Sequence, residues 1–208
     1  MKIAIVTDAW FPQINGVVRT LTKTREGLEA LGHDVIMITP EAFRTVPCPT
    51  YPEIRLSVFP GRGVSARLRA FGADHLHIAT EGPLGLAARR FARRNQLAFT
   101  TAYHTRFPEY VHSRIRLPLG WTYAFIRWFH RPGCAVMAPT NAVVDDLKKW
   151  RVGNPVIWQR GVDLELFRPE AGGRTNCDMK NPIFINVGRV AVEKNLEAFL
   201  DLVLPGEK

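Results

Sequence analysis

Residues 2–39, KIAIVTDAWFPQINGVVRTLTKTREGLEALGHDVIMIT, decide the fold of this chain. They open with a nearly all-apolar run at 2–7, the pattern of a strand that is buried on both faces of a parallel sheet. Apolar residues at mostly helical spacing follow over 17–31, ahead of Gly32, a natural helix stop. Residues 35–39 are the next apolar strand. A strand, a helix and a strand within about forty residues make a βαβ unit, and such units build parallel sheets with helices on both faces.

The same alternation continues down the chain and predicts an α/β, Rossmann-like parallel sheet. Strands are expected at 76–79, 98–102, 135–138 and from 156, and helices at 84–94, 118–131 and 141–150. Residues 40–63, rich in proline and aromatic residues, are expected to form a long loop or a short hairpin.

The last quarter of the chain suggests a second domain. Residues 168–182 have the proline, glycine and polar composition of an interdomain linker. A buried strand is predicted at 183–187 and a helix at 195–202, but one strand and one helix cannot bury their own apolar faces. We therefore expect a first domain at 1–167, the linker, and at 183–208 the first βα unit of a truncated second domain.

Composition excludes several classes of protein. The 208 residues are 46% apolar and 23% charged, which excludes disorder and collagen. The three cysteines are too few and too scattered for a disulfide framework or a zinc pair, so a reducing cytoplasm is expected. No uncharged apolar run approaches the roughly 18 residues that a membrane-spanning helix needs.

The positive charge is concentrated in one stretch. Between Arg62 and Arg131 there are twelve arginines and three acids, which accounts for the whole net charge of +9. Such a field attracts phosphates, nucleic acid or an acidic lipid surface, although a solvated arginine-rich surface would also aid solubility. Nucleic acid is not expected as a partner, because no RNA- or DNA-binding motif is visible.

Three polar segments follow predicted strands, so they should meet at the carboxyl edge of the sheet, where open α/β sheets bind ligands. Asn15 and Gly16 lie where the first loop enters a helix, which suits an anion, although Asn-Gly is also a plain turn. Glu81 and His104 follow two later strands, and each taken alone has an ordinary structural explanation. The absence of a G-x-G-x-x-G motif argues against NAD or FAD.

Five segments in order resemble the retaining GT-B glycosyltransferases of family 4, whose fold is two Rossmann-like domains facing across a cleft. They are N-G-V at 15–17, H-I-A-T-E-G-P-L-G at 77–85, Y-H-T-R-F-P-E-Y at 103–110, R-G-V-D with F-x-P at 160–169, and G-R-V-x-x-E-K-N at 188–195. The resemblance covers the whole chain.

The resemblance implies roles for individual residues on the donor side. Asn15 and Gly16 match the loop that approaches the donor diphosphate and helps to shape the acceptor site, and His104 matches the catalytic histidine near the donor sugar. The remaining donor-binding residues that it implies are Gly188 and the basic pair on the pyrophosphate, Arg189 and Lys194. Arginine, lysine and backbone N–H groups can stabilise charge on a leaving diphosphate without a metal, so no metal or cofactor is expected beyond the nucleotide-sugar substrate.

On the acceptor side the resemblance implies contacts from Glu81, Tyr103 and Arg106. The opening T-D-x-W-F-P-x-x-N-G-V-x-R-T looks like members that mannosylate lipids or lipid-linked glycans, which implies GDP-mannose as donor. A UDP-sugar-dependent glycolipid or sulfolipid synthase stays open, as does a non-catalytic basic module that binds membranes. In the family a pair of glutamates seven residues apart holds the nucleotide ribose and donor sugar, and this chain ends before that pair. We therefore expect little activity from the chain alone.

The arginine-rich stretch also predicts a docking surface for an anionic membrane beside the acceptor site, which would hold the protein peripherally at the inner face of the cell membrane. Helical spacing puts four arginines on one face, and a second segment mixes arginines with aromatic residues that could instead belong to the core. The residues of this predicted surface are Arg89, Arg90, Arg93, Arg94, Arg114, Arg116 and Trp121.

Overall fold

The computed structural model of the chain describes residues 1–13, 15–48, 51–104, 118–168, 184–188 and 195–203. It divides into two units, Met1–Gly161 and Val162–Lys208, and each is described by itself. The domain boundaries expected from the sequence, 1–167, 168–182 and 183–208, stay predictions.

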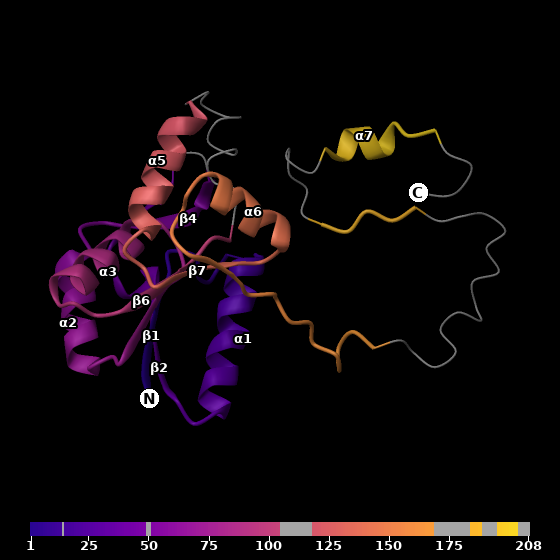
Figure 1. The fold of residues 1–208 in the computed structure, drawn as a ribbon. Helices are drawn as coiled ribbons and strands as arrows, with labels where there is room; N and C mark the ends of the chain where they lie inside the picture. The colour runs from indigo at the N-terminus through magenta and orange to yellow at the C-terminus, as the bar shows by residue number, and fades with distance from the viewer. Residues whose placement is uncertain (14, 49–50, 105–117, 169–183, 189–194, 204–208) are drawn as a thin grey trace. The chain divides into compact units, whose positions relative to one another are not determined.

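The first unit is built on a six-stranded parallel sheet, as the sequence predicts (Figure 1). Its strand order is β2-β1-β5-β6-β7-β8, which places β1 second from one edge, between β2 and β5. The strands are β1 (Lys2–Val6), β2 (Asp34–Ile38), β5 (His75–Ile78), β6 (Phe99–Ala102), β7 (Ala135–Ala138) and β8 (Pro155–Ile157).

Helices lie on both faces of this sheet (Figure 1). They are α1 (Gly16–Ala30), α2 (Gly61–Phe71), α3 (Pro83–Arg94), α5 (Leu119–His130) and α6 (Asn141–Lys149).

Strand β1 shows how the two faces are filled. Ala4 and Val6 belong to a buried cluster with residues of α2 and α3, whereas Ile5 packs with Val18 and Leu21 of α1. Successive side chains of a strand point to opposite faces, so an all-apolar strand is the one that needs helices on both sides. A third cluster joins α5 and α6 to β7.

The segment 40–63 is only partly as predicted. A short 3-10 helix (Pro40–Ala42) precedes an antiparallel hairpin of β3 (Thr45–Cys48) and β4 (Tyr51–Ser57), which confirms the hairpin alternative. The sequence reasoning missed α2, which begins at Gly61. Its buried residues, Val64 and Leu68, are four residues apart, but they are only two positions on a helix that also carries three arginines.

In the second unit the predicted strand at 183–187 is wrong over its described part. Residues 184–187 are irregular, and the side chains of Ile185 and Val187 are 74% and 90% exposed. A strand is stabilised by the backbone hydrogen bonds of a neighbouring strand, and the described residues of this unit offer none. The predicted helix is present as α7 (Leu196–Leu200), five residues long with none of them buried.

Candidate functional site at the carboxyl edge of the sheet

Asp8 ties two loops of the carboxyl edge together. It follows β1, and its carboxylate accepts hydrogen bonds from the Thr80 hydroxyl at 2.8 Å, Leu84 N–H at 2.9 Å and Gly85 N–H at 3.3 Å. The Asp8 N–H donates to Thr80 Oγ1 at 2.7 Å. The cap residue of α3 is Gly82, which has no side chain, so Asp8 satisfies the first amides of this helix from another loop. Burial raises the pKa of Asp8.

The start of α3 lies very close to the loop that precedes it. A Cβ atom at Gly85 would overlap the Thr80 carbonyl oxygen and would also meet Ile78 at 3.2 Å. Backbone atoms cannot move aside as the end of a side chain can, so only glycine allows α3 to start at this point. This close approach fixes the position of Glu81 within the turn.

We expect Gly85→Ala to lower the free energy of unfolding by about 2–4 kcal/mol, because the overlap is with backbone in a packed core. Urea unfolding followed by circular dichroism measures it. Gly27→Ala in α1 is the matched control, since nothing lies within 4 Å of its Cβ position. The control should be neutral or stabilising by up to about 1 kcal/mol. Equal losses in the two variants would contradict the packing argument.

Asn15 caps helix α1. Its Oδ1 accepts from the N–H groups of Val17 and Val18, both at 3.0 Å, and its Nδ2 donates to Gln13 Oε1. Asn15-Gly16 is therefore a helix cap, not a plain turn, and the cap residue already occupies two of the amides that an anion would use. The predicted diphosphate role of Asn15 stays a prediction, and its side chain has a structural role whichever ligand binds.

Arg160 lies directly against Gly16 and was not singled out by the sequence reasoning. A Cβ atom at Gly16 would come within 2.6 Å of Arg160 Nη1, so glycine leaves room for a guanidinium at the N-terminus of α1. This cation also lies near His104, whose pKa it helps to lower. A cation beside the positive end of a helix dipole is an arrangement that favours an anionic ligand.

His104 is held as a neutral imidazole. Its ring packs against Trp158 with the ring centroids 6.0 Å apart. The pKa of His104 is lowered to about 4, mainly by burial and secondly by the Arg160 charge, while Glu81 acts in the opposite direction. Its Nε2 is buried and has no hydrogen-bond partner among the described residues. A neutral ring with an open nitrogen can donate to or accept from a sugar hydroxyl.

Replacing the two charges beside His104 is expected to move its pKa in opposite directions. Arg160→Ala removes a nearby cation and should raise the pKa, whereas Glu81→Gln removes an anion and should lower it. NMR titration of the imidazole of His104 measures both shifts. Shifts of the same sign in the two variants would contradict this geometry.

Glu81 is oriented by a buried histidine that the sequence reasoning missed. His130 Nε2 lies 3.2 Å from Glu81 Oε1, and its Nδ1 lies 2.7 Å from the Thr101 hydroxyl. A carboxylate only accepts, so Nε2 donates to Glu81. The Glu81 side chain remains 21% exposed, which leaves the carboxylate accessible to a ligand while His130 holds it in place.

Of the predicted site residues, the structure brings Asn15, Gly16, Glu81 and His104 to one edge of the sheet. Tyr103 is 3% exposed and belongs to the core cluster of α5, α6 and β7, and its predicted acceptor contact stays a prediction. Gly188 belongs to the second unit. Other predicted residues lie outside the described residues: Arg106, Arg114, Arg116, Arg189 and Lys194.

The predicted docking surface needs one correction. Arg89 is 5% exposed, and it donates to the carbonyl oxygens of Phe129 and Trp128 in place of facing a membrane. Its helical position turns it toward α5. Four of the other predicted residues are exposed: Arg90, Arg93, Arg94 and Trp121.

The described residues contain no cluster of three or more histidine, cysteine, aspartate or glutamate side chains that could hold a metal ion. Within the same part of the chain, no helix is both long and apolar enough to cross a bilayer.

The fold and its edge site define the class of protein: a Rossmann-like domain of the GT-B glycosyltransferase type. A solved sucrose-phosphate synthase from Thermosynechococcus elongatus has the same fold, with a TM-score of 0.70 over 96% of this chain and 58% of that one, at 18% identity. The family profile of Glycosyltransferase Family 4 matches residues 14–166. The chain belongs to Glycosyltransferase Family 4.

Curated relatives span several sugar donors. The chain is 29% identical to a GDP-mannose-dependent alpha-mannosyltransferase of Mycobacterium tuberculosis, over 99% of this chain and 60% of the relative. It is 27% identical to a sulfoquinovosyl transferase of Arabidopsis thaliana, over 94% and 43%, and to an alpha-monoglucosyldiacylglycerol synthase of Streptococcus pneumoniae, over 96% and 51%. The chain thus spans about half the length of these relatives.

Proposed function

We propose that this chain supplies the acceptor-side domain of a glycosyltransferase that moves mannose from GDP-mannose, with retention, to a lipid or a lipid-linked glycan. The observation that carries the proposal is the Arg160 guanidinium against Gly16, at the N-terminus of α1 and beside the neutral His104. A glycosyltransferase needs a cation where the leaving diphosphate gathers charge and an uncharged polar group beside the sugar.

The leaving group is the nucleoside diphosphate, and charge develops on it as the sugar–phosphate bond breaks. Arg160 stabilises that charge from the first unit. The family resemblance assigns two further cations to the pyrophosphate, Arg189 and Lys194. Interactions that strengthen as the bond breaks raise kcat more than they lower KM.

On the acceptor side, Glu81 is the group proposed to bind the attacking hydroxyl. Its carboxylate accepts the hydroxyl hydrogen bond while His130 holds it from behind, at 3.2 Å. His104 then hydrogen-bonds a hydroxyl of the donor sugar. Both residues act by position, since catalysis at a bound pair of substrates depends on holding them in line.

A panel of nucleotide sugars tests the donor. The chain and longer products of its reading frame are incubated with GDP-mannose, UDP-glucose and UDP-sulfoquinovose. The nucleotide released from each donor is measured. GDP-mannose should be consumed fastest. Faster release of UDP would instead favour a UDP-sugar-dependent glycolipid or sulfolipid synthase. Two relatives carry names of the sulfolipid or glycolipid kind. If no product of the reading frame released nucleotide from any of the donors, a non-catalytic module would be favoured.

We also propose that the protein works at the inner face of the cell membrane, where a lipid acceptor would lie. Support comes from three exposed arginines at the end of α3, Arg90, Arg93 and Arg94, and from Trp121, which is 74% exposed on α5. Arginines near an anionic surface contribute about 1 kcal/mol each, and an exposed tryptophan suits the interface.

Substituting Arg90, Arg93 and Arg94 with glutamate is expected to reduce co-sedimentation with anionic vesicles by about tenfold or more, and added salt should release the parent protein. Neutral vesicles should bind neither protein. Arg89 is left unchanged because it is buried. Binding of the triple variant equal to that of the parent, or parent binding that is indifferent to salt, would count against a docking surface.

A further inference from the structure

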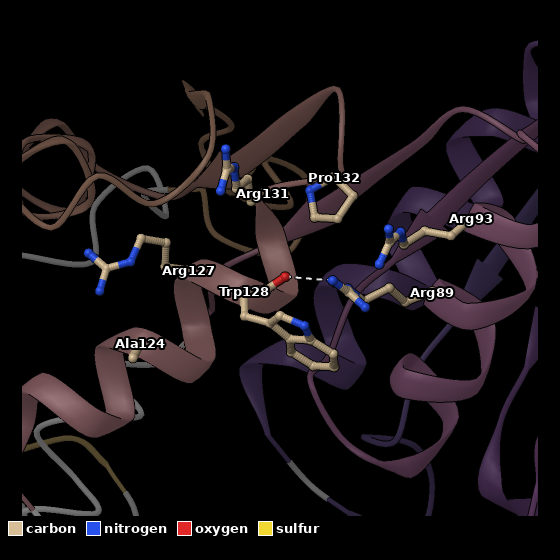
Figure 2. Close-up of a pocket in the computed structure, with 7 residues that line it drawn as sticks. All are labelled: Arg89, Arg93, Ala124, Arg127, Trp128, Arg131 and Pro132. Carbon is tan, nitrogen blue, oxygen red and sulfur yellow. Dashed lines mark hydrogen bonds between the residues drawn. The ribbon is translucent and has the colours of Figure 1, made fainter.

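Helices α3 and α5 enclose a groove of about 490 Å³ whose lining is dominated by guanidinium groups (Figure 2). Its walls include Arg89, Arg93, Arg127 and Arg131, together with Trp128 and Pro132. Among the described residues no acidic side chain lines it. Arg93 lies close enough to Arg89 to disfavour its charge, whereas the guanidinium of Arg127 points away from both (Figure 2). An anion beside Arg89 and Arg93 would offset this repulsion.

Arg89 is built into the wall of this groove. Its Nε donates to Phe129 O at 2.9 Å and its Nη2 donates to Trp128 O at 2.6 Å, and the guanidinium stacks over the Trp128 ring at 3.8 Å from the centroid. These contacts fix its orientation before any ligand binds. They satisfy donors, but they do not neutralise the charge. Burial, with Arg93 close by, lowers the pKa of Arg89.

The described ion pairs leave the groove without a counter-charge. They join Lys23 to Glu26, Arg25 to Glu29 and His130 to Glu81, and none of them reaches the four arginines. Arg127 donates to a carbonyl oxygen, that of Trp150. Arg93 and Arg131 are exposed, so their guanidinium groups are accessible to an anion from solution.

One end of the groove is removed from the proposed transfer site. Helix α3 starts at the carboxyl edge, and Arg93 is ten residues beyond Pro83. At 1.5 Å per residue this places Arg93 about 15 Å along the helix from its start. The other end is closer, because Arg131 follows His130, whose Nε2 lies 3.2 Å from Glu81 Oε1. An anion bound near Arg93 would be a second ligand, distinct from the donor diphosphate.

We propose that the arginine groove between α3 and α5 is a binding site for a phosphate group, either free phosphate or the phosphomonoester of a lipid headgroup. The planar fork of arginine matches phosphate oxygens with paired hydrogen bonds, and a doubly charged anion gains most from several guanidinium groups at once. The Trp128 ring offers an apolar wall for whatever the phosphate is attached to. The proposal does not depend on the glycosyltransferase activity.

The test titrates the 208-residue chain with inorganic phosphate at constant ionic strength and follows the side-chain Nε–H signal of Arg89 by NMR. Saturable binding is expected. The variant Arg93→Ala with Arg131→Ala should weaken it by at least about tenfold, the loss expected for charged hydrogen bonds. Arg89 is kept, since its removal could unfold the α3–α5 contact.

The matched control is Lys148→Ala with Lys149→Ala. It removes the same charge from the exposed end of α6, outside the groove between α3 and α5. Phosphate affinity in this control should stay within about twofold of the parent, because screened charges outside the groove contribute little. Equal losses in the two double variants, or no saturable binding by the parent, would overturn the proposal, since net charge alone would then explain the data.

Vesicles distinguish the two sources of the phosphate. Phosphatidylcholine vesicles carry phosphatidic acid or, at matched surface charge, phosphatidylglycerol. A preference for phosphatidic acid that Arg93→Ala with Arg131→Ala abolishes identifies a lipid headgroup as the occupant. Saturable phosphate binding without that preference identifies free phosphate.

Discussion

Replacing Asp8 with alanine is expected to lower the free energy of unfolding by about 3–5 kcal/mol. The variant leaves the Thr80 hydroxyl and the N–H groups of Leu84 and Gly85 without their acceptor, in a place where water cannot replace it. Each buried unsatisfied donor costs about 1–3 kcal/mol. Since these bonds also join the loop after β1 to the start of α3, the edge that carries Glu81 should loosen as well.

Two variants make this prediction specific. Asp8→Asn keeps one acceptor oxygen and carries no charge to bury, so it should lower the free energy of unfolding by only about 1–2 kcal/mol. Asp34→Ala removes an exposed aspartate and should stay within about 0.5 kcal/mol of the parent. Chemical unfolding of the three proteins measures the series. An Asp8→Ala loss no larger than that of Asp34→Ala would show that Asp8 does not cap α3.

The second large effect is on turnover. In a product of this reading frame that is active as a mannosyltransferase, Arg160→Ala should lower kcat by about 10²–10³-fold with a much smaller change in KM. The reason is that charge grows on the diphosphate only as the bond breaks. Arg160→Lys keeps the charge without the planar fork and should recover part of the loss. Arg151→Ala, an exposed arginine with no proposed role, is the control. An unchanged kcat in Arg160→Ala would exclude it from the leaving group.

The sheet was predictable because its strands are buried on both faces. Residues 3–6 and 35–38 are continuous apolar runs, and continuous runs separated by a helix are typical of parallel sheets. Helix α2 was not predictable in the same way, since only Val64 and Leu68 of its residues are buried. The strand expected at 183–187 is not formed over its described residues. An apolar run becomes a buried strand only where other residues cover it, and the described residues of that unit provide nothing for Ile185 to pack against.

Two residues of the candidate site could be predicted from their positions in the sequence, and two could not. Glu81 and His104 come after strands, and the topology carries them to one edge. His130 and Arg160 act on residues 49 and 144 positions away, through contacts that a single sequence does not reveal. Arg89 was predicted to face a membrane. Helical spacing does not reveal what covers a helix face, and at Arg89 the carbonyl oxygens of α5 accept its hydrogen bonds.

The most direct measurement of the central claim is an NMR titration of the 208-residue chain with GDP-mannose. Weak, saturable binding in the millimolar range is expected, with shifts at Gly16, the Arg160 side chain and the His104 imidazole, and with loss of those shifts in Arg160→Ala. Weak binding fits a chain that spans about half the length of its curated relatives. Shifts confined to other surfaces, or an Arg160→Ala titration that matches the parent, would contradict donor binding at the carboxyl edge.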